Sequence, residues 1–142
     1  MEQTLSTNER DWAIYANLAG LLWLTGLPFA HIIGPLAIYL KIRQESGFAA
    51  AIARASLNFQ ITQTLVSLVL VTAGSIAVFM ATHASAGFRH DQVSAPILIV
   101  GITFFAVLIP LAIVNIVSCI RGAIAASKGE PFNYPFAIAF VH

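Results

Sequence analysis

Charge is scarce in this sequence, and that scarcity limits what the protein can be. Charged residues make up 9% of the chain, against about 25% in a typical soluble domain, and none stands between Arg54 and Arg89. The formal net charge is only +1, so no basic field indicates nucleic acid as a partner. The single cysteine, Cys119, excludes a disulfide within the chain. The first residues lack a basic segment followed by an apolar core, so we expect no cleavable signal peptide.

Long apolar runs take the place of charge. Hydrophobic residues make up 58% of the chain and the mean hydropathy is +0.85. The uncharged run between Arg54 and Arg89 is long enough for a transmembrane helix. The sequence therefore predicts an all-α, polytopic membrane bundle forming one domain over residues 1–142. The predicted helices cover about 8–26, 28–44, 55–82 and 95–127, followed by an aromatic tail, 129–142, at the membrane interface.

The first apolar stretch, Trp12 to Leu40, allows two interpretations. It contains two prolines and three glycines, and its length exceeds one untilted crossing of a ~30 Å hydrocarbon core. It forms either one kinked helix, giving three crossings in all, or a hairpin of two short crossings, giving four. The hairpin places six of the seven basic residues on one side, Arg89 being the exception, and the positive-inside rule favours that arrangement. We therefore predict four crossings.

The same rule orients the chain. It predicts a multi-pass protein of the bacterial inner membrane with both termini in the cytoplasm. Five cations at helix ends are candidate anchors for topology or for anionic lipid headgroups: Lys41, Arg43, Arg54, Arg121 and Lys128.

Polar side chains gather where the third and fourth predicted helices approach the cytoplasm. This polar collar consists of Asn58, Gln60, Gln63, Asn115 and Ser118. Amides at the edge of a bilayer need partners, so the collar either bonds helices together, contacts another subunit or lines a polar path. A second candidate surface is a stripe of small residues that lets helices approach closely: Ala73, Ala77 and Ala81.

Catalytic chemistry has little support in the sequence. The centres of the predicted crossings contain no charged residue or histidine, the usual mark of an intramembrane relay. Cys119 has no histidine near it along its helix. His31 and His83 fall at similar depth in the four-crossing arrangement, but no metal-ligand spacing accompanies them. We expect no enzyme activity and no metal or other cofactor, and the sequence identifies no small-molecule substrate.

Several short motifs resemble a known family. They are Glu9-Arg10-Asp11-Trp12-Ala13, Asn17-Leu18-Ala19-Gly20-Leu21, His31-Ile32-Ile33-Gly34-Pro35-Leu36, Leu57-Asn58-Phe59-Gln60-Ile61-Thr62 and Gly129-Glu130-Pro131-Phe132-Asn133-Tyr134-Pro135. Together they resemble the bacterial relatives of the twenty-kilodalton subunit of the chloroplast inner-envelope import translocon. The resemblance implies a helical membrane fold with both termini inside and a role related to translocation. Asn17, Ala55 and Ala139 depart from that family's usual residues.

Two functions remain open at this stage. The first is a small non-enzymatic membrane protein that works through helix–helix contacts, as a homo-oligomer or as an accessory subunit. Its partners would be the lipid bilayer and either its own copies or other membrane subunits. The alternative is a pore or translocase component with a path lined by Asn58, Gln60, Gln63 and Asn115.

Overall fold

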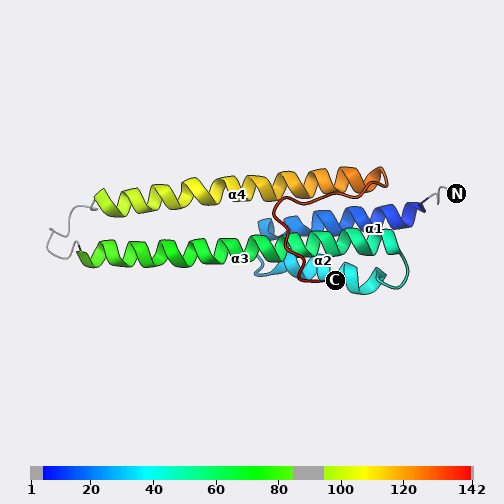
Figure 1. Ribbon diagram of the computed structural model, residues 1–142, viewed down its shortest axis with the longest axis horizontal. Helices are drawn as coiled ribbons and strands as arrows, with labels where there is room; N and C mark the ends of the chain where they lie inside the picture. The colour runs from blue at the N-terminus through cyan, green and yellow to red at the C-terminus, as the bar shows by residue number, and fades with distance from the viewer. Residues whose placement is uncertain (1–4, 85–94, 142) are drawn as a thin grey trace. The chain divides into compact units, whose positions relative to one another are not determined.

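The computed structural model describes residues 5–84 and 95–141, and every regular element in these ranges is helical. In chain order the elements are α1 (Thr7–Leu18), the 3₁₀ helix η1 (Ala19–Thr25), α2 (Ala30–Ile42), α3 (Gly47–Ala84) and α4 (Ala95–Ser127) (Figure 1). The predicted all-α fold is confirmed. Between the predicted helices 55–82 and 95–127, the expected polar loop with His90 and Asp91 lies outside the described residues.

The chain divides into two compact units, each described by itself. The first unit comprises Met1–Gln63 and Val114–His142, and the second comprises Thr64–Ile113. Both α3 and α4 contribute residues to each unit.

Helix α1 begins at a capping box. The Ser6 hydroxyl accepts a hydrogen bond from the Glu9 amide at 3.3 Å, and the Glu9 carboxylate accepts one from the Ser6 amide at 2.9 Å. Such a box satisfies amides that the first helical turn leaves without partners. The Glu9 carboxylate also accepts a bond from the Ser46 hydroxyl at 2.8 Å. Since Ser46 precedes α3, Glu9 ties the start of one helix to the start of another.

A tight reversal separates η1 from α2. Gly26 ends η1 with a φ of 76°, a left-handed conformation that glycine adopts without a steric cost. Helix α2 then runs back along η1 and α1, and a Cβ atom on Gly34 would lie 2.9 Å from both the Ala19 Cβ and the Leu22 Cδ1. The missing side chain of Gly34 therefore permits the close approach. The stretch 12–40 forms two antiparallel arms and not one kinked helix.

The predicted four crossings are wrong in number, because two helices and not four have the length and composition of a membrane span. Helices α1 and α2 have 12 and 13 residues, or ~18 and ~20 Å at ~1.5 Å per residue. A hydrocarbon core is ~30 Å thick. The regular α-helix ends sooner than predicted on both sides of the reversal, at Leu18 and at Ile42. By contrast α3 has 38 residues and α4 has 33.

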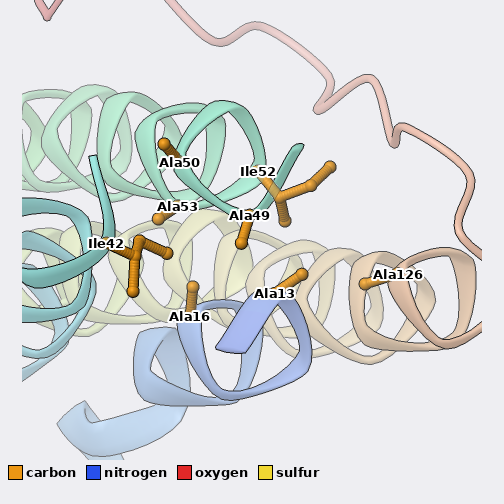
Figure 2. Close-up of a cluster of buried hydrophobic side chains, with 8 residues drawn as sticks. All are labelled: Ala13, Ala16, Ile42, Ala49, Ala50, Ile52, Ala53 and Ala126. Atoms are coloured by element: carbon orange, nitrogen blue, oxygen red, sulfur yellow. The ribbon is translucent and has the colours of Figure 1, made fainter. Parts of the chain in front are cut away.

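The apolar core of the first unit is built mainly from alanine. Figure 2 shows side chains from α1, the end of α2, the start of α3 and the end of α4 meeting in one cluster: Ala13, Ala16, Ile42, Ala49, Ala50, Ile52, Ala53 and Ala126. Small residues let helix backbones approach closely. This packing also explains why α3 begins at Gly47, earlier than the predicted start at 55. Ser46 accepts a bond from the Ala49 amide at 3.2 Å, so residues 47–54 join the same helix.

The second unit contains the most apolar parts of α3 and α4. Gly74 on α3 faces Phe104 on α4, whose Cε2 atom would lie 2.9 Å from a Cβ at that glycine. Large apolar side chains around this contact are exposed, including Leu68, Val69, Ile76, Ile102, Phe105 and Ile109. A surface of this kind suits lipid or other membrane helices as its surroundings.

Candidate functional site

A buried amide pair lies at the centre of the first unit. The Asn115 Nδ2 atom on α4 donates to the Gln60 Oε1 atom on α3 at 3.0 Å, and both side chains are buried. The Asn115 Oδ1 atom accepts from the Trp23 indole Nε1 on η1 at 3.1 Å. One asparagine thus bonds α4 to both α3 and η1.

Cys119 completes this network. Its Sγ atom accepts a hydrogen bond from the Gln60 Nε2 at 3.3 Å and lies 3.8 Å from the Asn115 Oδ1. Gly20 on η1 packs directly against Gln60 and Cys119. A Cβ atom at Gly20 would collide with the Gln60 amide and lie 2.8 Å from the Cys119 Sγ. The thiol is buried and its hydrogen-bond partners are the amides of Gln60 and Asn115, so the arrangement supports a structural role.

Asn58 and Thr62 hold the chain's C-terminal segment against α3. The Asn58 Oδ1 atom accepts from the amides of Phe140 and Val141 at 3.1 and 2.9 Å, and its Nδ2 donates to the Val141 carbonyl at 3.1 Å. The Thr62 hydroxyl accepts from the Ile138 amide at 3.0 Å and donates to the Asn58 carbonyl at 2.8 Å. Figure 1 shows this segment returning from α4 to lie over α3. We call these two residues and their bonds the tail clamp.

Tyr134 fixes the tail a second time. Its phenol donates to the Asn17 Oδ1 atom on α1, and its ring stacks on Phe59 with the centroids 4.7 Å apart. Gly122 leaves room for this contact, since a Cβ atom there would collide with the Asn17 Oδ1 and lie 2.8 Å from the Tyr134 hydroxyl. Burial raises the pKa of the Tyr134 phenol, so the hydroxyl keeps the proton that it donates.

The structure brings two members of the predicted polar collar together, Gln60 and Asn115, whereas Asn58 bonds the C-terminal segment. Asn58, Gln60, Asn115 and Ser118 are buried, and Gln63 is half-buried. Sequence reasoning did not identify Trp23, Asn17 and Tyr134 as parts of this region. A tryptophan inside an apolar stretch and a tyrosine among prolines were the available signals, but neither identifies a partner that lies far away in the sequence.

The predicted interfacial tail is divided between two environments. Tyr134 is buried, whereas Phe136 is 88% exposed and adopts a φ of 59°. Phe132 packs edge-on against Tyr134 with the centroids 4.9 Å apart. The tail is thus anchored to the unit on both sides of an exposed aromatic residue.

The remaining predicted residues occupy the surface or its edge. Ala73 is exposed, while Ala77 and Ala81 are half-buried. Among the candidate anchors Arg54 is half-buried and four are exposed: Lys41, Arg43, Arg121 and Lys128. The Lys41 ammonium lies 4.1 Å from the centroid of the Trp12 ring, a cation–π contact.

A metal centre finds no support in the described ranges, where no three His, Cys, Asp or Glu side chains gather to hold an ion. His31 is half-buried in α2. His83, at the end of α3, packs against Phe79 with the ring centroids 4.2 Å apart.

Two long apolar helices and a core of mutually bonded amides are features of an α-helical membrane protein. Residues 8–141 match the model of the MamF/MmsF family, described as the magnetosome magnetite crystal formation protein family, and the chain belongs to that family. No curated protein and no solved structure matches the chain.

This assignment overturns the resemblance to relatives of the chloroplast translocon subunit, which was wrong. The motifs behind it have packing roles in the structure. Gly34 permits close approach of α2 to η1, and Asn58 and Gln60 bond the tail and α4. Requirements of this kind arise in helical membrane proteins generally, so the motifs did not identify one family.

Proposed function

We propose that this protein is a non-enzymatic component of a magnetosome-type bacterial membrane, acting through contacts with its own copies or with other membrane subunits. The observation that carries the proposal is the contrast between buried polar side chains and exposed apolar ones. In the first unit, buried polar side chains bond with one another and with the backbone. In the second unit, large apolar side chains face outward.

This contrast favours a scaffold over a catalyst. An enzyme needs polar groups aimed at a substrate, whereas the amides of Asn58, Gln60 and Asn115 are used to hold helices and tail together. The family description supplies the setting, which is magnetite crystal formation in the magnetosome. A role in that process is part of the proposal.

The proposed topology has two crossings, α3 and α4, with both termini in the cytoplasm. Because the hairpin 12–40 returns to the side from which it starts, the six-to-one distribution of basic residues is the same whether its arms cross or not. The positive-inside rule then places the side with Arg54 and Arg121 in the cytoplasm.

The alternative, a pore or translocase component lined by the collar, is the weaker candidate. A hydrated path needs polar groups that face water. Asn58, Gln60 and Asn115 are buried and their amides are bonded within the unit.

Association is tested by crosslinking in native membranes, purification in mild detergent, and mass spectrometry of the recovered complex. We expect either a defined oligomer of this chain or a stoichiometric membrane partner. A chain that remains monomeric at native abundance in the membrane would overturn the proposal.

The small-residue stripe supplies a variant for the same assay. Ala73 is its exposed member, so Ala73→Leu blocks close approach of a neighbouring helix without filling the space between α3 and α4. We expect less crosslinked complex for Ala73→Leu. The control is Val71→Leu, an enlargement at another exposed position of α3, which leaves the complex at the wild-type level.

A further inference from the structure

The hairpin 12–40 exposes an apolar surface that nothing else in the described chain covers. From η1 through α2 the exposed large side chains are Leu22, Leu24, Leu27, Phe29, Ile33, Leu36 and Leu40. Leu27, beside the reversal, is 64% exposed. No charged residue interrupts the stretch between Asp11 and Lys41. A contiguous surface of this kind is costly to leave in water.

The position of the Gln60–Asn115 pair along α3 and α4 indicates how deeply the hairpin enters the membrane. Arg54 lies six residues before Gln60 on α3, and Arg121 lies six residues after Asn115 on α4. At ~1.5 Å per residue each arginine is ~9 Å along its helix from the Gln60–Asn115 bond. Two antiparallel helices thus place a cation at the same distance on the same side of the pair.

Trp23 relates the depth of the hairpin to that of the Gln60–Asn115 pair. Its indole donates to Asn115, so the residues next to the reversal lie near the level of the amide pair. That level is ~9 Å inside when the headgroups are at Arg54 and Arg121. With the headgroups at Lys41, the start of α2 at Ala30, eleven residues away, is ~16 Å inside. A bilayer is ~40 to 45 Å thick with its headgroups, so its midplane lies at least ~20 Å from the headgroup surface. The hairpin therefore ends before the midplane.

The open end of the hairpin carries positive charge, which is complementary to anionic lipid headgroups. Lys41 and Arg43 are exposed there, and Trp12 contacts the Lys41 ammonium. On the end of α4 and the start of the tail, Arg121 and Lys128 line a surface pocket of about 410 Å³ together with the carboxylate of Glu130. Cations and an indole beside an apolar surface are typical of a segment that meets anionic headgroups at its base.

We propose that the hairpin 12–40 is a wedge inserted into one leaflet of the bilayer. Its occupant is lipid, with acyl chains around Leu24, Leu27 and Phe29 and anionic headgroups at Lys41 and Arg43. The wedge enters and leaves on the side of Arg54 and Arg121. The inference relies on the proposed placement of α3 and α4 in a membrane and does not depend on which partner the protein has.

The first test locates the reversal by labelling a cysteine in proteoliposomes with a membrane-impermeant maleimide. Leu27→Cys places the thiol at the exposed reversal, and Glu45→Cys places one at the exposed turn before α3. The wild-type protein, whose only cysteine is buried, sets the background. We expect Glu45→Cys to label from its own side, and Leu27→Cys to label from neither side until detergent is added.

Labelling of Leu27→Cys from the side opposite Glu45 would mean that the hairpin crosses the bilayer. Labelling from the same side would mean that it lies in water. Either result overturns the wedge, while crosslinking of the complex would still report on the proposed function. Retention of the wild-type circular dichroism spectrum confirms that each variant is folded.

The second test asks whether lipid or protein covers the hairpin. Trp12→Phe leaves Trp23 as the only tryptophan, and its fluorescence is measured in vesicles of lipids brominated at shallow or deep acyl positions. We expect stronger quenching from shallow bromines than from deep ones. Equal protection from both would mean that a protein surface covers the hairpin, and stronger quenching from deep bromines would place it beyond one leaflet. Both outcomes contradict the proposal.

Discussion

The side chain of Asn115 on α4 donates a hydrogen bond to that of Gln60 on α3, 3.0 Å away, and both are buried. Because Asn115 also accepts from Trp23 at 3.1 Å, a single amide joins three helical segments. Buried polar groups that satisfy one another specify one arrangement of helices, whereas apolar contacts alone tolerate several. The first unit therefore has a fixed internal arrangement despite a core made largely of alanine.

Replacing Asn115 by leucine should destabilise the first unit. The change removes the acceptor of the Trp23 indole and the donor to the Gln60 carbonyl, and a buried group that loses its partner costs ~1–3 kcal/mol. Hydrogen bonds between membrane helices average ~0.6 kcal/mol, so we expect a loss of ~1–2 kcal/mol in the free energy of unfolding. Titration with SDS in mixed micelles, followed by circular dichroism, measures it. Thr103→Val, an exposed position on α4, is the control, and equal stability of both variants would contradict the structural role of the pair.

The sequence was sufficient to predict an all-helical fold but not the residues that bond its helices to one another. Helical spacing and the positions of Asn58, Gln60 and Asn115 predicted a shared polar region. Helix geometry is local, and the expected depth in the membrane placed these residues of two helices at the same level. The bonds of Trp23 to Asn115 and of Tyr134 to Asn17 join residues 92 and 117 positions apart. No local pattern encodes such pairs.

The prediction of four membrane crossings was wrong for a related reason. Hydropathy predicted that residues 12–40 lie in the membrane but did not show where the regular α-helix would end. Where the helix changes to 3₁₀ at Ala19, Gly20 packs closely against Gln60 and Cys119, and Ala19 against Gly34. These contacts join segments distant in sequence, which no local pattern encodes.

Replacing Asn58 by alanine should release the C-terminal segment from the tail clamp. The variant removes the acceptor of the Phe140 and Val141 amides and the donor to the Val141 carbonyl. We expect faster hydrogen exchange of the amides of residues 138–141, with exchange in α4 unchanged, measured by mass spectrometry in detergent. Asn133→Ala removes an exposed amide from the same tail and should leave exchange at the wild-type rate. Unchanged exchange in Asn58→Ala would show that the clamp does not hold the segment.

Acidification should loosen the junction between α1 and α3. Hydrogen bonds from the Ser6 amide and from the Ser46 and Ser6 hydroxyls hold the pKa of the Glu9 carboxyl below its usual value. A carboxyl whose pKa is lowered by folding contributes stability that is present above the unfolded pKa and is lost as pH falls through the folded one. We therefore expect exchange of the α1 amides to accelerate, relative to intrinsic rates, below the usual carboxyl range.

The Glu9→Gln variant provides the comparison for this pH dependence. Glutamine keeps the shape of the side chain but has no charge to lose at this position. We expect the variant to show faster α1 exchange at neutral pH and no further acceleration on acidification. A wild-type profile in the variant would assign the pH effect to another carboxyl group.

Two glycine substitutions on α4 should have opposite effects. At Gly122 an added methyl group would collide with the Asn17 oxygen and press on the Tyr134 hydroxyl, whereas at Gly101 it meets nothing within 4 Å. Alanine in a helix interior is otherwise favoured over glycine by up to ~1 kcal/mol. We expect Gly101→Ala to leave the free energy of unfolding unchanged or raised, and Gly122→Ala to lower it and to make the segment after α4 more susceptible to limited proteolysis. Because both changes add the same methyl group to the same helix, helix propensity cannot account for a difference in sign. Two variants equally resistant to protease would contradict the docking of Tyr134 on Asn17.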